Sequence, residues 1–134
     1  MKIEYATQED YQFIIERDKH INGLLIRSKI REHEIFILRD QNQEIGWMRY
    51  GHFWDNIPFM NMIWIDEDYR GRGFGKEVVL HWEELMRQRG FKLVMTSTLS
   101  NEDAQHFYRK LGYRDSGCLL LEDEPLEVIL VKKL

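Results

Sequence analysis

The chain has 134 residues, a length typical of one compact domain, so we expect a single domain over residues 1–134. Hydrophobic residues make up 43% and charged residues 31%, as in a globular protein with a true core. The net charge of −4 argues against a nucleic-acid partner, and no apolar run approaches the roughly 18 residues that a membrane-spanning helix needs. One cysteine, Cys118, and the lack of a recognisable signal peptide favour a reducing, cytoplasmic setting.

The first half of the chain predicts one strand, then two helices, then three further strands. A strand at residues 3–6 leads into a helix that Thr7 caps, with Asp10 at the capping-box position, and this helix runs to about residue 17. A second helix begins near Asn22. A polar turn at residues 39–43 then separates strands at 34–38 and 44–53, which should form a hairpin. Residues 59–65 are nearly all apolar, as expected of a central strand covered on both faces.

The second half predicts alternating helices and strands. Residues 73–89 form the clearest helix, because apolar side chains recur at a period near 3.6 and Gly90 supplies the stop. A strand at 91–98, a helix at 101–111 and strands at 113–121 and 126–131 follow. This order predicts an α/β (α+β) fold with a mixed, mostly antiparallel sheet of about six to seven strands and helices on both faces. Strands 59–65 and 91–98 should form its central parallel pair, joined by a right-handed crossover.

A glycine-rich turn stands between the central strand and the clearest helix. Gly71, Gly73 and Gly75 lack a Cβ, so their backbone N–H groups can approach a ligand closely. The first amides of the helix have no partner within it, and the helix dipole adds positive charge there. Full positive charges around the same turn come from Arg70, Arg72 and Lys76. The glycines, the free amides and these charges together predict an anion site of pyrophosphate size. Alternatively, the glycines make only a tight turn.

Two common phosphate-binding loops do not fit this turn. A Walker A loop needs Ser or Thr after Gly-Lys to hold magnesium, whereas Glu77 follows Gly75-Lys76. A dinucleotide-binding loop has the spacing G-x-G-x-x-G, whereas the glycines here have the spacing G-x-G-x-G. The five histidines are scattered and a single cysteine makes no zinc knuckle, so we expect no metal site.

Two motifs resemble the GCN5-related N-acetyltransferase (GNAT) superfamily. Its acetyl-CoA signature is Gln or Arg, two residues, Gly, one residue, then Gly or Ala, and Arg70, Gly73 and Gly75 match it. Residues 101–113 are similar to the family's Asn-x-x-Ala-x-x-Phe-Tyr-x-Lys-x-Gly-Phe/Tyr stretch. The resemblance covers at least residues 59–113, with the two motifs in the family's order. It implies the acyl-CoA N-acyltransferase fold.

The resemblance also implies a function and a site. The protein would be an N-acetyltransferase that uses acetyl-CoA as co-substrate and moves the acetyl group to an amine by direct attack through a tetrahedral intermediate. Amides of residues 71–76 would hold the CoA pyrophosphate, and the backbone from Ile63 to Ile65 would pair with the pantetheine arm where the sheet splays. Asn101 would bond near the pantetheine, and Tyr108 would stand near the thioester sulfur.

The chemistry of acyl transfer gives Tyr108 its role. The departing thiolate needs a proton, and a tyrosine hydroxyl can supply it, so Tyr108 is the expected general acid. The alternative is a core aromatic of an amphipathic helix. The general base is not identified. Some relatives carry a glutamate early in the central strand, where this chain has Phe59, and Asp55, His52 or a water chain are the alternatives.

The acceptor is expected to be a small amine. Aromatic residues crowd the segment before the loop, namely Trp47, Tyr50, Phe53, Trp54, Phe59 and Trp64, and acidic residues lie nearby. Three other readings stay open: a non-catalytic acyl-CoA-binding or regulatory domain of the same fold, a nucleotide-phosphate-binding protein, and a structural partner domain. Residues 126–131, as an exposed end strand, could pair with a second copy in a homodimer.

Overall fold

The computed structural model describes residues 1–134. Its strands are β1 (Lys2–Tyr5), β2 (Ile35–Asp40), β3 (Gln43–Phe53), β4 (Ile57–Ile65), β5 (Leu93–Leu99), β6 (Arg114–Leu119) and β7 (Glu127–Lys133). Its helices are α1 (Tyr11–Arg17), α2 (Gly23–Arg31), α3 (Phe74–Gln88) and α4 (Ala104–Lys110), with short 3₁₀ turns η1 (Gln8–Asp10) and η2 (Glu67–Tyr69). None of the helices is both long and apolar enough to cross a membrane.

The strands form a seven-stranded sheet in the order β1-β2-β3-β4-β5-β7-β6. Neighbouring strands pair antiparallel at β1–β2, β2–β3, β5–β7 and β6–β7, whereas β4 and β5 are parallel. This confirms the predicted mixed sheet with a central parallel pair. The prediction that residues 126–131 form an end strand is wrong, because β7 lies between β5 and β6. The apolar β7 takes the inner place, and β6, exposed along its whole length, forms the edge.

The chain divides into two compact units. The first contains Met1–Tyr50 and Met62–Val78, and the second contains Gly51–Asn61 and Val79–Leu134. Each unit takes two separate stretches of chain, so the division does not cut the sequence into two consecutive domains. The single domain over residues 1–134 stays a prediction.

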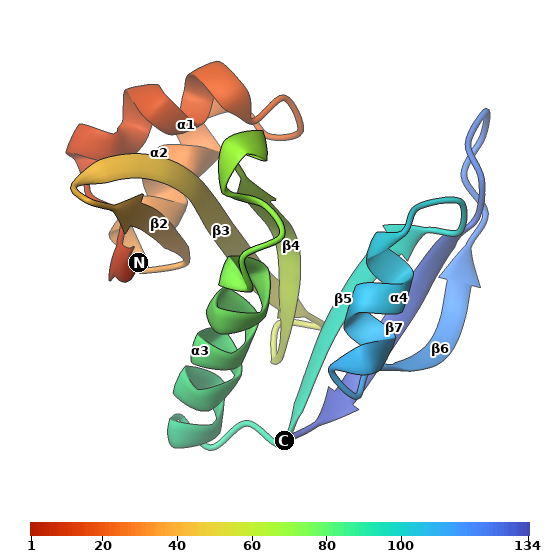
Figure 1. The fold of residues 1–134 in the computed structure, drawn as a ribbon. Helices are drawn as coiled ribbons and strands as arrows, with labels where there is room; N and C mark the ends of the chain where they lie inside the picture. Colours follow the sequence, from red (N-terminus) through yellow and green to blue (C-terminus); the bar gives the residue numbers. More distant parts are fainter. The chain divides into compact units, whose positions relative to one another are not determined.

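The first unit has a core between its two N-terminal helices and β2–β3 (Figure 1). Ile14 of α1 and Ile26 and Ile30 of α2 bury their side chains against Ile37 and Trp47. Ile26 and Ile30 are four residues apart and therefore lie on one face of α2. The predicted capping box before α1 is present, since Thr7 N–H donates to Asp10 and the Thr7 hydroxyl accepts from the backbone. The side chain of Asn22 caps α2 in the same way, accepting from the Leu25 N–H.

The second unit packs α4 and the C-terminal part of α3 on one face of its strands. Figure 1 shows α4 along β5, and Tyr108 of α4 is buried there. On α3, Glu83 accepts hydrogen bonds from Lys132 of β7 and from the Tyr113 hydroxyl, at 2.7 and 2.8 Å. The predicted helix at 101–111 is shorter than expected, because a turn in which Glu102 N–H donates to the Leu99 carbonyl delays α4 to Ala104.

Candidate active site

The glycine turn in the first unit adopts the backbone that only glycine accepts readily. Gly71 and Gly73 have φ of 75° and 82°, and a Cβ on either would meet nothing within 4 Å. α3 begins directly after them, at Phe74, and Glu77 N–H donates to the Gly73 carbonyl at 3.1 Å. Amides before Glu77 have no partner further back in the helix. The turn therefore leaves room beside N–H groups that lie at the positive end of the helix dipole.

Gly75 differs from the other two glycines of the motif. It lies inside the first turn of α3 and is half-buried. Its place in the motif therefore does not depend on a left-handed backbone. Lys76, the next residue, is exposed, so its ammonium group is available at the start of the helix.

The two arginines of the turn are anchored on backbone carbonyls. Arg70 Nε donates to the Ile65 carbonyl at 2.7 Å, and Arg72 donates to the Asp68 carbonyl at 3.2 Å. Arg72 also lies over the Tyr69 ring, 5.1 Å from its centre. A guanidinium group has five N–H donors, so both side chains keep donors for an anion while they brace the turn. Ile65, which ends β4, is buried, and Ile63 is half-buried.

Tyr108 lies in the second unit and is nearly enclosed. It is 5% exposed, and its ring packs edge-on against Phe107 and Tyr113 at 5.2 and 5.5 Å between ring centres. Burial raises its pKa to about 12, a hydrogen bond with Thr96 acts in the opposite direction, and the Glu102 carboxylate raises it further. Tyr108 therefore keeps its proton at neutral pH, which is the form that a general acid requires.

Asn101 lies in the exposed turn between β5 and α4. The Gln105 amide donates to the carbonyls of Ser100 and Glu102, at 2.8 and 2.9 Å, and so fixes the turn on both sides of Asn101. The sequence motif contains Gln105, but its role in holding this turn was not predicted. The Ser100 N–H also donates to the Leu126 carbonyl at 2.8 Å, which ties the turn to the segment before β7.

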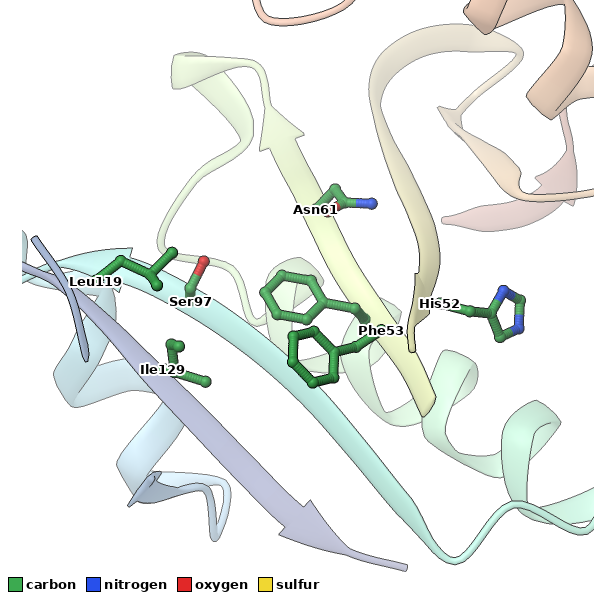
Figure 2. A pocket seen from close by; sticks show the side chains of 7 residues that line it. His52, Phe53, Asn61, Ser97, Leu119 and Ile129 are labelled. Atoms are coloured by element: carbon green, nitrogen blue, oxygen red, sulfur yellow. The ribbon is translucent and has the colours of Figure 1, made fainter. Parts of the chain in front are cut away.

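A cavity of about 390 Å³ opens in the second unit (Figure 2). Its apolar wall is made by Phe53, Phe59, Leu119 and Ile129, and its polar groups belong to His52, Asn61 and Ser97. The parallel pairing joins Phe59 to Met95 and Met60 to Thr96, and the next residues of the two strands, Asn61 and Ser97, both line the cavity. The cavity thus lies next to the last pair of this register.

The cavity and Tyr108 lie on opposite faces of β5. Successive side chains of a strand point to opposite faces. Thr96 bonds to Tyr108 on the α4 side, and its hydroxyl donates to the Met60 carbonyl at 3.0 Å. Ser97, the next residue, points into the cavity. The backbone of β5 therefore separates Tyr108 from the cavity.

The predicted aromatic segment divides between core and cavity. Phe53 and Phe59 line the cavity, whereas Trp47 and Tyr50 are buried in the first unit. Trp64 stacks on Trp47 with 5.1 Å between ring centres, and Trp54 is 76% exposed in the turn before β4. Of the three positions considered for a general base, Phe59 and His52 line the cavity, and Asp55 lies exposed in that turn. The base stays unassigned.

Sequence reasoning missed Glu83, which is 2% exposed and bridges Tyr113 and Lys132. Burial, followed by the Glu83 carboxylate, holds the pKa of Tyr113 well above its usual range. Because Tyr113 packs against Tyr108, the Glu83 network fixes one wall of the Tyr108 environment. The sequence did contain one indication that Glu83 is buried, because it directly follows Trp82 on the apolar face of the helix predicted at residues 73–89.

A family model described as the acetyltransferase (GNAT) family matches residues 2–113. The chain therefore belongs to the acetyltransferase (GNAT) family, as the two motifs implied. A curated relative, the uncharacterized protein YyaT of Bacillus subtilis (strain 168), is 32% identical over 97 residues. That match covers 70% of this chain but only 62% of the relative, so the chain spans less than two thirds of the relative's length.

Solved structures share the fold. Ard1 from Thermoplasma volcanium superimposes with a TM-score of 0.85 at 15% identity, covering 99% of this chain and 97% of that one. A chain of the NatC complex bound to Gag peptide and CoA superimposes with a TM-score of 0.80 at 17% identity, covering 100% and 99%. At these identities the likeness establishes the fold alone.

Proposed function

We propose that the protein transfers an acetyl group from acetyl-CoA to a small-molecule amine. The observation that carries the proposal is the turn of residues 70–76, with two glycines at positive φ beside the start of α3 and three basic side chains around it. This arrangement fits a pyrophosphate, because N–H groups, dipole and cations all favour a dianion at one point. Family membership and the CoA bound to a structure of the same fold add support.

The residues have separate tasks in this proposal. Acetyl-CoA supplies an activated acyl carbon when bound. The backbone of residues 71–76 and the side chains of Arg70, Arg72 and Lys76 bind its pyrophosphate, while Ile63, Ile65 and Asn101 position its pantetheine arm. Tyr108 holds the proton that the sulfur leaving group needs. The acceptor must shed its own proton, because an ammonium group with a pKa of about 10.4 has no lone pair for attack.

The central test uses acetyl-CoA binding and free-thiol release. Replacing Gly73 with valine puts a β-branched side chain where φ is 82°, and it places a Cβ in the open space beside the helix amides. We expect the affinity for acetyl-CoA, measured by isothermal titration calorimetry, to fall about tenfold or more, since the distorted turn loses pyrophosphate hydrogen bonds.

Gly90→Val is the matched control for this variant. Gly90 has a φ of 91° and equally open surroundings, but it follows the opposite end of α3. It should lose stability to a similar extent while binding acetyl-CoA like the unmodified protein. Equal affinities in the two variants would remove the turn from the binding site.

The pKa of Tyr108 leads to a prediction for the pH dependence of the reaction. With an aliphatic amine as acceptor, kcat/KM should rise with pH as the amine becomes neutral. Because the pKa of Tyr108 is about 12, loss of its proton should not lower the rate up to about pH 10. The measurement is a pH–rate profile by thiol release. A falling limb below about pH 9 that disappears in Tyr108→Phe would contradict the prediction.

A further inference from the structure

The cavity of the second unit is lined by apolar and neutral polar side chains and lacks the carboxylates that would attract a charged amine. Two phenylalanine rings and two aliphatic side chains form its wall, and Asn61 and Ser97 bring neutral polar groups (Figure 2). No Asp, Glu, Lys or Arg is among the lining residues. Asp55, a candidate for the general base, does not line the cavity either. The cavity therefore offers no permanently charged counter-ion, and His52 is the only lining side chain that can take up a proton.

Two of the residues that line the cavity, Ser97 and Ile129, are paired across neighbouring strands. Ser97 of β5 is in register with Ile129 of β7, and Ile129 is in register with Gly117 of β6. Gly117 has no side chain, and a Cβ built on it would meet nothing within 4 Å, so no side chain projects from this position of the edge strand. Leu119 then stands two residues further along β6, on the same face as Gly117. The cavity thus sets the apolar side chains of Ile129 and Leu119 beside the neutral polar groups of Asn61 and Ser97.

The chemistry of the lining residues determines which acceptors this cavity favours. A second ammonium group would find no carboxylate among the lining residues, and a carboxylate would find no Lys or Arg. An aromatic or alkyl body gains from contact with Phe53, Phe59 and Ile129. The Asn61 carbonyl and the Ser97 hydroxyl can accept hydrogen bonds from an amine N–H, and they remain neutral when they do so.

We propose that this cavity binds the acceptor and selects a primary amine with one aromatic or alkyl body and no second charge. The inference rests on the proposed acetyl transfer and names the acceptor class for it. Because the cavity lies on the face of β5 away from Tyr108, the amine would reach the acyl group from the side opposite the general acid. Asn61 and Ser97 orient the amine, and the two rings hold its body.

Two matched pairs of acceptors test the selection. 2-Phenylethylamine and phenylalanine differ by one carboxylate, and 1-aminohexane and 1,6-diaminohexane differ by one ammonium group. We expect kcat/KM for thiol release to be at least about tenfold higher for the first member of each pair. Equal or better turnover of phenylalanine or the diamine would overturn the proposal.

A variant that adds a negative charge to the cavity should shift its preference between the two alkyl amines. Asn61→Asp places a carboxylate in the cavity and should raise the ratio of kcat/KM for 1,6-diaminohexane over 1-aminohexane about tenfold or more. Asn56→Asp is the control, because Asn56 is exposed in the turn before β4 and does not line the cavity. An unchanged ratio in Asn61→Asp, or an equal change in Asn56→Asp, would also overturn the proposal.

A binding measurement separates this inference from the proposed function. Titrating 2-phenylethylamine into methyl-labelled protein without acetyl-CoA should shift the methyl resonances of Leu119 and Ile129, whereas phenylalanine should shift them far less. Shifts without any thiol release would refute acetyl transfer and leave the cavity assignment standing. Thiol release without these shifts would support the enzyme and refute the assignment of its acceptor site.

Discussion

Replacing Tyr108 with phenylalanine should lower kcat for acetyl transfer by about a hundredfold or more, with acetyl-CoA affinity unchanged. The ring is 5% exposed and packs between two aromatic neighbours, so phenylalanine fills the same space. The change removes the hydroxyl that can protonate the leaving sulfur, together with its bond to Thr96. Steady-state thiol release gives kcat, and calorimetry gives the affinity for acetyl-CoA.

Tyr113→Phe is a demanding control for this prediction. Tyr113 is also buried, its ring centre lies 5.5 Å from that of Tyr108, and its hydroxyl donates to Glu83. Losing that hydrogen bond should lower the melting temperature and leave kcat within a few-fold of the unmodified protein. If Tyr108→Phe turns over as fast as Tyr113→Phe, Tyr108 has no part in the chemistry. An unmodified protein that binds acetyl-CoA but releases no thiol with any amine would indicate a non-catalytic binding domain instead.

The sequence predicted the fold well because its strongest signals are local. The period of the apolar residues in α3, the capping box at Thr7 and the glycines at both ends of α3 all depend on neighbours a few residues apart. The two motifs then supplied the family. The order of the last two strands was wrong, since which strand of a hairpin pairs with β5 depends on contacts distant in sequence.

The candidate site was predictable only in part, for the same reason. Residues 70–76 form one continuous turn, so their spacing was enough to indicate an anion site. The cavity combines residues from β3, β4, β5, β6 and β7, and its lack of charged groups became visible only once those strands were paired. Glu83 and Asp18 have side-chain partners 29 or more residues away, and nothing in their local sequence identifies those partners.

Replacing Asp18 with asparagine should lower the free energy of unfolding by about 3–5 kcal/mol, because it leaves the Arg49 charge buried without its carboxylate. Asp18 follows α1 and is 2% exposed, and its carboxylate accepts from Arg49 Nε at 2.7 Å and from Trp47 Nε1 at 3.2 Å. Urea unfolding followed by fluorescence provides the measurement. Arg109 and Asp115 form a similar pair on the surface, with an Nε–Oδ1 distance of 2.9 Å, so Asp115→Asn should have a much smaller effect.

The loss caused by Asp18→Asn should also depend on pH. Burial alone would raise the pKa of Asp18, but the bonds and charge of Arg49, with the His20 N–H and Trp47, outweigh it and hold that pKa below its usual value. A carboxyl group with a lowered pKa stabilises the folded state fully above its unfolded pKa of about 3.9, and this stabilisation disappears as the pH falls through the folded value. The difference between the two proteins should therefore stay constant from about pH 7 to about pH 5 and shrink below about pH 4. A difference that grows on acidification would show that the ion pair does not stabilise the first unit.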